Sequence, residues 1–197
     1  MKLWHLFLAL GMAPDLQDSE RPGLAAAYEM LRIPLLQFIL RMTGDPEETL
    51  DMMHETFARA LAGNKTPPDN PGWRRYLFRI AVNLCRDRAR HRRIMRTESF
   101  EELEEKRGPL PGPERLPGLH LELHQAEDFA RAFIDSLPVK EKAVLLMKKT
   151  QGMSYEEIRL VMNSSLRTVK RQAKNAIIKL TEAMEQAGFF EGGGGNE

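Results

Sequence analysis

The chain has 197 residues, a formal net charge of +1 and a single cysteine, Cys85. This length suits one medium domain or two small ones, each with a modest hydrophobic core. One cysteine excludes an internal disulfide and a zinc site built from cysteines, and it agrees with a reducing compartment, so we expect a cytoplasmic protein. The net charge averages opposed segments, because basic residues gather at 73–96 and 140–179 and an acidic run follows the first cluster. Local patches of charge, rather than the net charge, therefore determine which partners the chain can bind.

The N-terminal sequence MKLWHLFLAL is a short apolar run that follows a lysine. It is like the core of a signal peptide, but it is too short to span a bilayer. A second methionine, Met12, precedes a polar run that contains Pro14 and Pro22. We expect residues 1–24 to be a dispensable extension, and we expect no membrane insertion of this chain.

Two helices are predicted before the first basic cluster. Apolar residues recur at intervals of three and four over 24–42, a helical pattern in which Pro34 is expected to cause a kink or a division. The sequence TGDP at 43–46 then supplies a helix end, a cap and a first-turn proline. The second helix is expected over 47–61, and the loop NKTPPDNPG at 64–72 follows it.

The segment 73–96 is predicted to be one helix of about 36 Å with two unlike faces. One face is mainly apolar, with Trp73, Leu77, Ile80, Leu84 and Arg88. The opposite face carries Arg75, Arg79, Arg86, Arg90 and Arg93, with Asn83 at its edge. An ordinary solvated charged face would carry both signs and many lysines, whereas Asp87 is the only acid here. The pattern therefore favours a packed helix that presents a phosphate-binding surface to nucleic acid.

Residues 98–126 are expected to be a flexible linker, acidic at first and then rich in proline and glycine. Within it, His120 and His124 lie one helical turn apart with Glu122 between them. Two histidines and one carboxylate form a common and incomplete metal set, so we predict no metal site.

A second helical domain is expected over 127–187. Ser154 and Glu157 match a capping box, Asn163 suits the left-handed conformation of a tight turn, and a basic helix starts near Leu166. A short capped helix, a turn and a basic helix are the arrangement of a helix-turn-helix, although ordinary helical hairpins share it. The predicted fold is thus all-α, with two small helical domains joined by a linker, the second a helix-turn-helix (winged-helix-like) DNA-binding domain.

Together these segments resemble the extracytoplasmic-function (ECF) sigma factors, the two-domain promoter-recognition subunits of bacterial RNA polymerase in the sigma-70 family. Residues 25–97 are similar to the sigma-2 domain through LLQFILRMTGDPEETLDMMHETFARAL, the aromatic start at Trp73 and IAVNLCRDRAR. Residues 127–187 are similar to sigma-4 through SLPVKEKAVLLM, GMSYEEI and RTVKRQAKNAIIKL. The order and spacing of these segments carry the resemblance.

The resemblance implies roles for individual residues. Asp51, His54 and Glu55 match the surface that binds the clamp helices of the polymerase β′ subunit, with His54 where the family usually has Gln. Contacts to the −10 element and to the melted strand are implied for Trp73, Arg75, Arg79, Asn83, Arg86 and Arg90, and Trp73 is equally well explained as a core anchor. Contacts to the −35 element are implied for Arg167, Thr168, Lys170, Arg171 and Lys174. Arg159 and Arg167 stand where the family commonly has Ala and Gly.

The predicted function is that of a sigma factor without catalytic residues or cofactors, which binds core polymerase (β′ clamp helices and β flap) and promoter DNA. An anti-sigma factor is the further partner that the resemblance implies. The glycines at 192–195 lack the Lys-Ser/Thr of a phosphate-binding loop, so residues 188–197 are expected to be a flexible tail. The alternatives are a sigma-like decoy that binds an anti-sigma factor and a helix-turn-helix regulator that does not initiate transcription.

Overall fold

The computed structural model describes residues 23–98 and 119–189. Within these two ranges the chain is helical and contains no strand, which confirms the predicted all-α class. No helix in them is long and apolar enough to cross a membrane. The helices are α2 (Leu24–Thr43), α3 (Pro46–Ala62), α4 (Asn70–Glu98), α5 (Leu119–Ser136), α6 (Val139–Lys149), α7 (Tyr155–Met162) and α8 (Leu166–Gln186).

Helix α2 runs without interruption through Pro34, so the division is wrong, whereas the kink remains a prediction. Proline removes one backbone hydrogen bond from a helix, but Leu31 and Leu35 on either side of it are both buried in the core. Most helical stability in proteins comes from such packing, which here outweighs the missing bond. Leu24 is also buried, so the packed part of the chain includes the last residue of the predicted extension.

The junction between α2 and α3 follows the predicted pattern. Gly44 adopts a left-handed conformation with φ 76°, and its N–H donates to the carbonyl oxygen of Leu40. The Asp45 carboxylate accepts hydrogen bonds from the backbone N–H groups of Glu47 at 2.8 Å and Glu48 at 3.2 Å. These bonds satisfy amides that the first turn of α3 leaves without helical partners.

Helix α4 begins at Asn70, three residues before the predicted start, inside the expected loop. The Asp69 carboxylate accepts a 2.6 Å hydrogen bond from the backbone N–H of Gly72, which is a typical N-cap contact. Pro71 occupies the first turn, where a missing N–H is tolerated. The proline and glycine in this segment thus led to the prediction of a loop where a capped helix begins.

Helix α5 begins at Leu119, so the predicted linker is too long at its C-terminal end. Its last proline and glycine are Pro117 and Gly118, and the next residues, LHLELHQA, contain neither. Leucine, glutamate, glutamine and alanine are good helix formers, which explains the earlier start.

The helix-turn-helix of α7 and α8 forms as predicted. The Ser154 backbone N–H donates to the Glu157 carboxylate at 2.8 Å, and the Glu157 N–H donates to the Ser154 hydroxyl at 3.2 Å, which completes the capping box. Asn163 makes the turn with φ 47°. Ser165 then caps α8, whose buried side consists of Val169, Ala173 and Ala176.

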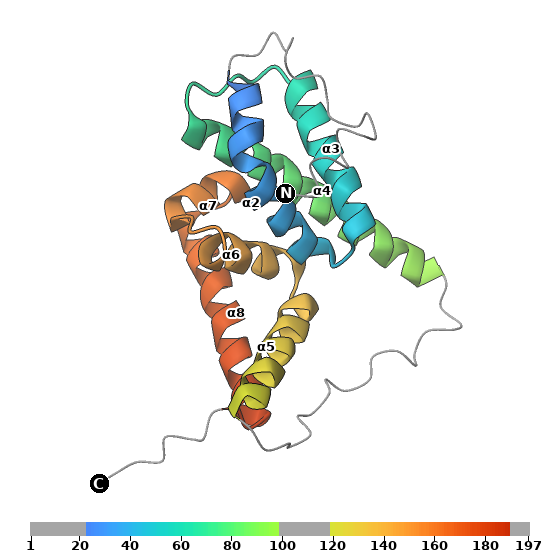
Figure 1. Ribbon diagram of the computed structural model, residues 1–197, viewed down its shortest axis with the longest axis vertical. Coiled ribbons are helices and arrows are strands. Elements are labelled where there is room, and N and C mark those ends of the chain that lie inside the picture. Colours follow the sequence, from blue (N-terminus) through green and yellow to red (C-terminus); the bar gives the residue numbers. More distant parts are fainter. Residues whose placement is uncertain (1–22, 99–118, 190–197) are drawn as a thin grey trace.

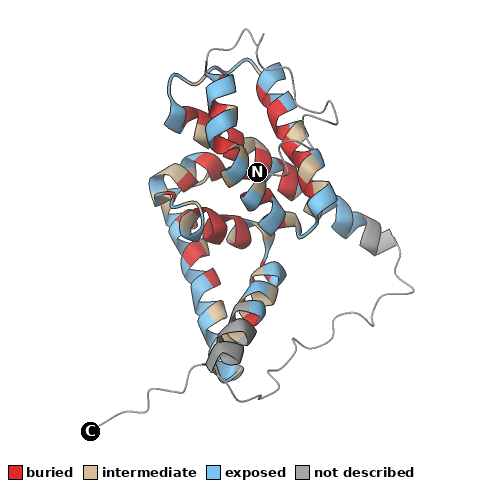
Figure 2. Ribbon diagram, viewed as in Figure 1, coloured by how far each residue is buried: buried red, intermediate tan, exposed pale blue. Residues whose placement is uncertain are grey.

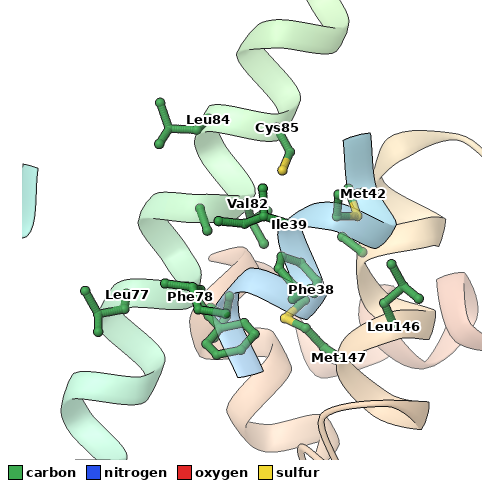
Figure 3. Close-up of a cluster of buried hydrophobic side chains, with 14 of the residues drawn as sticks. Phe38, Ile39, Met42, Leu77, Phe78, Val82, Leu84, Cys85, Leu146 and Met147 are labelled. Atoms are coloured by element: carbon green, nitrogen blue, oxygen red, sulfur yellow. The ribbon is translucent and has the colours of Figure 1, made fainter. Parts of the chain in front are cut away.

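The helices before and after residues 99–118 pack against each other through one hydrophobic cluster (Figures 1 and 2). Helix α4 contacts α2 and α3 on one side and α6 and α7 on another. Figure 3 shows side chains of α2 and α4 beside Leu146 and Met147 of α6. The two predicted domains therefore share a core in this structure.

Replacing Gly23 should test the packing that starts α2. Gly23 has φ +87°, and a Cβ there would lie 2.7 Å from Nε1 of the buried Trp73 indole. We expect Gly23→Ala to lower the free energy of unfolding by more than the roughly 1–3 kcal/mol that a strained backbone costs. Gly44→Ala is the matched control, because Gly44 has φ +76° and open space around the added Cβ. Urea unfolding of both variants measures the difference, and equal losses would contradict the clash.

Candidate nucleic-acid interface

Helix α8 presents a row of cations to solvent. Arg167, Lys170, Arg171 and Lys174 are all exposed, and their spacing of three and four places them on one side of the helix. In the described ranges none of the four forms an ion pair. Thr168 is half-buried, with its hydroxyl 2.8 Å from that of Ser165 at the cap. Four of the five predicted −35 residues are thus available to a polyanion, and the fifth supports the helix start.

The arginine row of α4 is only partly accessible. Asn83 and Arg90 are exposed, and Arg90 donates to the Asp87 carboxylate at 2.8 Å. Arg86 is half-buried. Near the start of the helix, Arg75 and Arg79 are half-buried beside α7. The predicted −10 surface is therefore open at Asn83 and Arg90 and partly covered at Arg75, Arg79 and Arg86.

Trp73 is 1% exposed and is among the largest fully buried side chains. Its indole lies against Gly23 and is 6.1 Å from the Tyr76 ring between centroids. In this arrangement Trp73 anchors the start of α4 in the core and is not accessible to a base. Of the two roles that the sequence left open, the structure supports the anchor.

The three predicted polymerase-binding residues line one cleft between α3 and α4, with a volume of about 670 Å³. Asp51, His54 and Glu55 come from α3, and Glu55 is paired with Arg59 at 2.6 Å. The facing side chains on α4 are Leu84, Asp87, Arg88 and His91. Arg88 and His91 were not predicted to be part of this surface. Arg88 was predicted on the same face of the helix as Leu84, and His91 follows Leu84 at a helical interval of seven, so the apolar face could have indicated both residues.

The cap of α7 places negative charge beside the start of α4. The pKa of Glu157 is lowered, first because its carboxylate accepts a hydrogen bond from the Ser154 backbone N–H. The nearby charges of Arg74 and Arg75 lower it further. Glu157 therefore stays ionised at neutral pH and faces two arginines of α4.

The absence of a metal site at His120 and His124 remains a prediction, because the side chains of these two residues lie outside those that the structure describes. Among the described side chains, no cluster of three or more histidine, cysteine or acidic groups could hold a metal ion.

Both helical parts of the chain are similar to known proteins. Residues 27–94 match the family model of sigma-70 region 2, and residues 130–180 match that of sigma-70 region 4. The chain is 32% identical over 172 residues to the ECF RNA polymerase sigma factor EcfG of Rhodopseudomonas palustris, covering 84% of this chain and 85% of that protein. It is 30% identical to the RNA polymerase sigma factor CnrH of Cupriavidus metallidurans, covering 74% and 78% of the two chains.

A solved structure shares the fold. The sigma factor RpoE of Bartonella quintana, crystallised with the anti-sigma factor NepR, aligns with a TM-score of 0.57 and 15% identity, covering 82% of this chain and 96% of that one. With two sigma regions in the expected order and curated relatives matched along most of their length, the class is clear. The chain belongs to the ECF group of sigma-70 family sigma factors, which direct promoter-specific initiation of transcription.

Cys85 should be unreactive in the folded protein. Burial raises the pKa of its thiol to about 12, with a smaller contribution in the same direction from Glu48. Because the thiolate is the reactive form, we expect negligible alkylation by iodoacetamide at pH 8 and rapid alkylation after unfolding in urea. Mass spectrometry measures both. Rapid labelling of the native protein would show that the α2–α4 packing opens easily.

Proposed function

We propose that this sigma factor acts in the cytoplasm, binds core RNA polymerase through the α3–α4 cleft, and selects promoters through α4 and α8, without catalysis of its own. The observation that carries the proposal is that the chain has two cationic helices, one in each sigma region: α4 lies in the part that matches region 2, and α8 lies in the part that matches region 4. Two separated DNA-binding helices suit two separated promoter elements.

The −35 element is assigned to α8. The helix exposes Arg167, Lys170 and Arg171 near its start, the part of a recognition helix that comes closest to base edges in the major groove. Arginine and lysine make bidentate or single hydrogen bonds to guanine there. Lys174, one turn further on, suits a phosphate contact.

The −10 element is assigned to the face of α4. Asn83 is exposed and carries both a donor and an acceptor, so it suits a base edge. Arg75, Arg79, Arg86 and Arg90 supply affinity for phosphate that salt weakens. Strand opening also requires capture of unpaired bases, which offsets an unpairing cost of a few kcal/mol. The neighbouring loop 64–69 is the segment that we assign to this capture.

The polymerase surface is assigned to the α3–α4 cleft. Asp51 and Glu55 supply acceptors, and His54 supplies a hydrogen-bonding group where the family usually has Gln. Arg88 and His91 extend the same surface from α4. Because the cleft carries both acidic and basic side chains, it suits a partner helix that carries charges of both signs along its length. The structural neighbour was crystallised with an anti-sigma factor, which supports a regulator of that class for this chain also.

Mapping transcript starts tests the function directly. We expect the purified chain, added to core polymerase and genomic fragments, to give a discrete set of starts that share spaced −35 and −10 sequences. Core polymerase alone is the control. Binding to polymerase without specific starts would support the decoy instead.

The cleft assignment predicts a selective loss of polymerase binding. Replacing Asp51 and Glu55 with Ala should weaken binding to core polymerase at least about tenfold, because two acceptors and their charges are lost. Binding of the same variant to DNA should not fall, since neither residue lies on α8 or on the arginine row. The matched control, Glu47→Ala with Glu182→Ala, removes the same charge from exposed positions outside the cleft. Equal losses in both double variants would remove the cleft from the interface.

The −35 assignment predicts a change of sequence preference. Arg171→Ala should reduce discrimination at one −35 position by about 1–3 kcal/mol, because a base-edge contact is lost. Arg131→Ala removes an exposed charge from α5 and should weaken binding uniformly or not at all. Selection from a randomised −35 library compares the two. An unchanged preference in Arg171→Ala would exclude that residue from the reading surface.

A further inference from the structure

We propose that His54 and His91 make the binding of core polymerase depend on pH, because both line the α3–α4 cleft beside the carboxylates that would bind polymerase. The inference rests on the proposed role of this cleft, and it adds a regulation of that site. Histidine is the side chain whose charge ordinarily changes between about pH 5 and 8. Two of the five histidines of the chain lie in this one cleft.

The cleft collects charged and titratable side chains from two facing helices. Its described walls come from α3 and α4. They carry three carboxylates, two arginines and two histidines, which are Asp51, His54, Glu55 and Arg59 on α3 and Asp87, Arg88 and His91 on α4. The carboxylates and the arginines keep their charges near neutral pH. The charge of the cleft in this range therefore depends on the two histidines.

Two of the three carboxylates already have a cationic partner on their own helix. Glu55 is paired with Arg59 at 2.6 Å, and Asp87 is paired with Arg90 at 2.8 Å. Asp51 is exposed and forms no ion pair with any residue that the structure describes. Asp51 is therefore the acceptor in the cleft that is most open to a cation of the polymerase.

His54 lies three residues after Asp51 on the same side of α3. Side chains at this spacing are neighbours on a helix surface, and opposite charges there attract each other. A neutral imidazole has one donor and one acceptor, whereas the protonated ring has two donors and a positive charge. Protonated His54 would therefore compete with a cation of the polymerase for Asp51. Because His54 is half-buried, water and salt screen this competition less than they would at the open surface.

His91 acts in the same direction from the opposite wall. It follows Asp87 and Arg88 at intervals of four and three, so it lies on the side of α4 that lines the cleft. Protonation of His91 adds a second cation beside Arg88, which weakens the attraction of the cleft for a cationic partner. His91 is exposed, so its effect should be smaller than that of His54.

The sign of the pH dependence follows from these contacts. A polymerase cation at Asp51 favours the neutral form of both histidines. Binding therefore releases protons from the cleft, and by linkage the affinity rises as the pH rises through the range in which histidine titrates.

The test measures the affinity of the full chain for core polymerase by surface plasmon resonance at pH 8 and at pH 6, at constant ionic strength. We expect binding about fivefold weaker at pH 6, a factor typical of one partly exposed charge pair. Polymerase titrates as well, so every variant is measured against the same polymerase. Comparing the pH 8 to pH 6 ratios of the variants then cancels its contribution.

Two substitutions at position 54 separate charge from shape. His54→Gln keeps a hydrogen-bonding side chain that is never charged, so it should reduce the affinity ratio between the two pH values, whatever its affinity at pH 8. His54→Lys carries its charge at both pH values, so it should bind weakly at both and also reduce the ratio. The matched control replaces His120 and His124 of α5 with Gln, and it should keep the ratio of the parent chain.

His91→Gln is a second variant at an exposed position, in case substitutions at the half-buried His54 prevent folding, which circular dichroism detects. It should reduce the ratio by a smaller factor. A ratio in the folded Gln variants equal to that of the parent, or an affinity that increases as the pH falls, would overturn the proposal. Binding that is independent of pH would contradict this inference alone. Absence of polymerase binding at pH 8 would contradict the proposed function and this inference with it.

Discussion

The structure depends on the burial of about half the circumference of α4. Its buried residues are Trp73, Leu77, Phe78, Ala81, Val82, Leu84 and Cys85. A helix that packs on one neighbour needs only a stripe, whereas this set spans roughly 180° at 100° per residue. The reason is that α4 lies between two groups of helices, α2 and α3 on one side and α6 and α7 on the other. Removing this helix would expose the apolar sides that both groups turn toward it.

The same burial allows α4 to be a scaffold that also carries the proposed binding surfaces. Phe78 packs against Phe38 of α2, with ring centroids 5.2 Å apart, and Leu84 lines the cleft toward α3. Arg86 and Arg90 extend from the remaining side. Their positions relative to the cleft are fixed by a rigid helix, so the proposed polymerase and DNA contacts are held in one geometry.

Polar contacts also join α4 to the helices after residue 119. Arg74 and Arg79 donate to the carbonyl oxygens of Gln151 and Leu160, and the Glu157 carboxylate lies near Arg74 and Arg75. At the end of α2, the buried Lys142 ammonium donates to the Met42 carbonyl oxygen at 3.3 Å. Buried cations require partners of this kind, because an unpaired buried charge is costly.

The helices, their caps and the chemistry of their faces can be predicted from the amino-acid sequence. Local rules suffice for these features: Asp45, Ser154 and Asn163 act within one turn of their own helix ends, and a cationic row such as that of α8 follows from helical periodicity. The all-α class followed from the same local patterns, whereas the family and the order of the two regions were implied by the resemblance of the segments at 25–97 and 127–187 to sigma factors. The start of α4 at Asn70 was missed because proline and glycine in a capped first turn look like a loop.

Which parts of those faces are covered depends on how the helices pack against one another. Phe78 and Val82 lie next to the arginine row, and both are buried because other helices pack against this side of α4, with Phe78 against Phe38 of α2. Lys142 looks like a surface residue in the sequence, and its burial depends on Met42, a hundred positions earlier. The role of Trp73 likewise depended on Gly23. Contacts between residues far apart in the chain are not encoded in helical periodicity, because burial of an apolar or charged side chain depends on which helix lies against it.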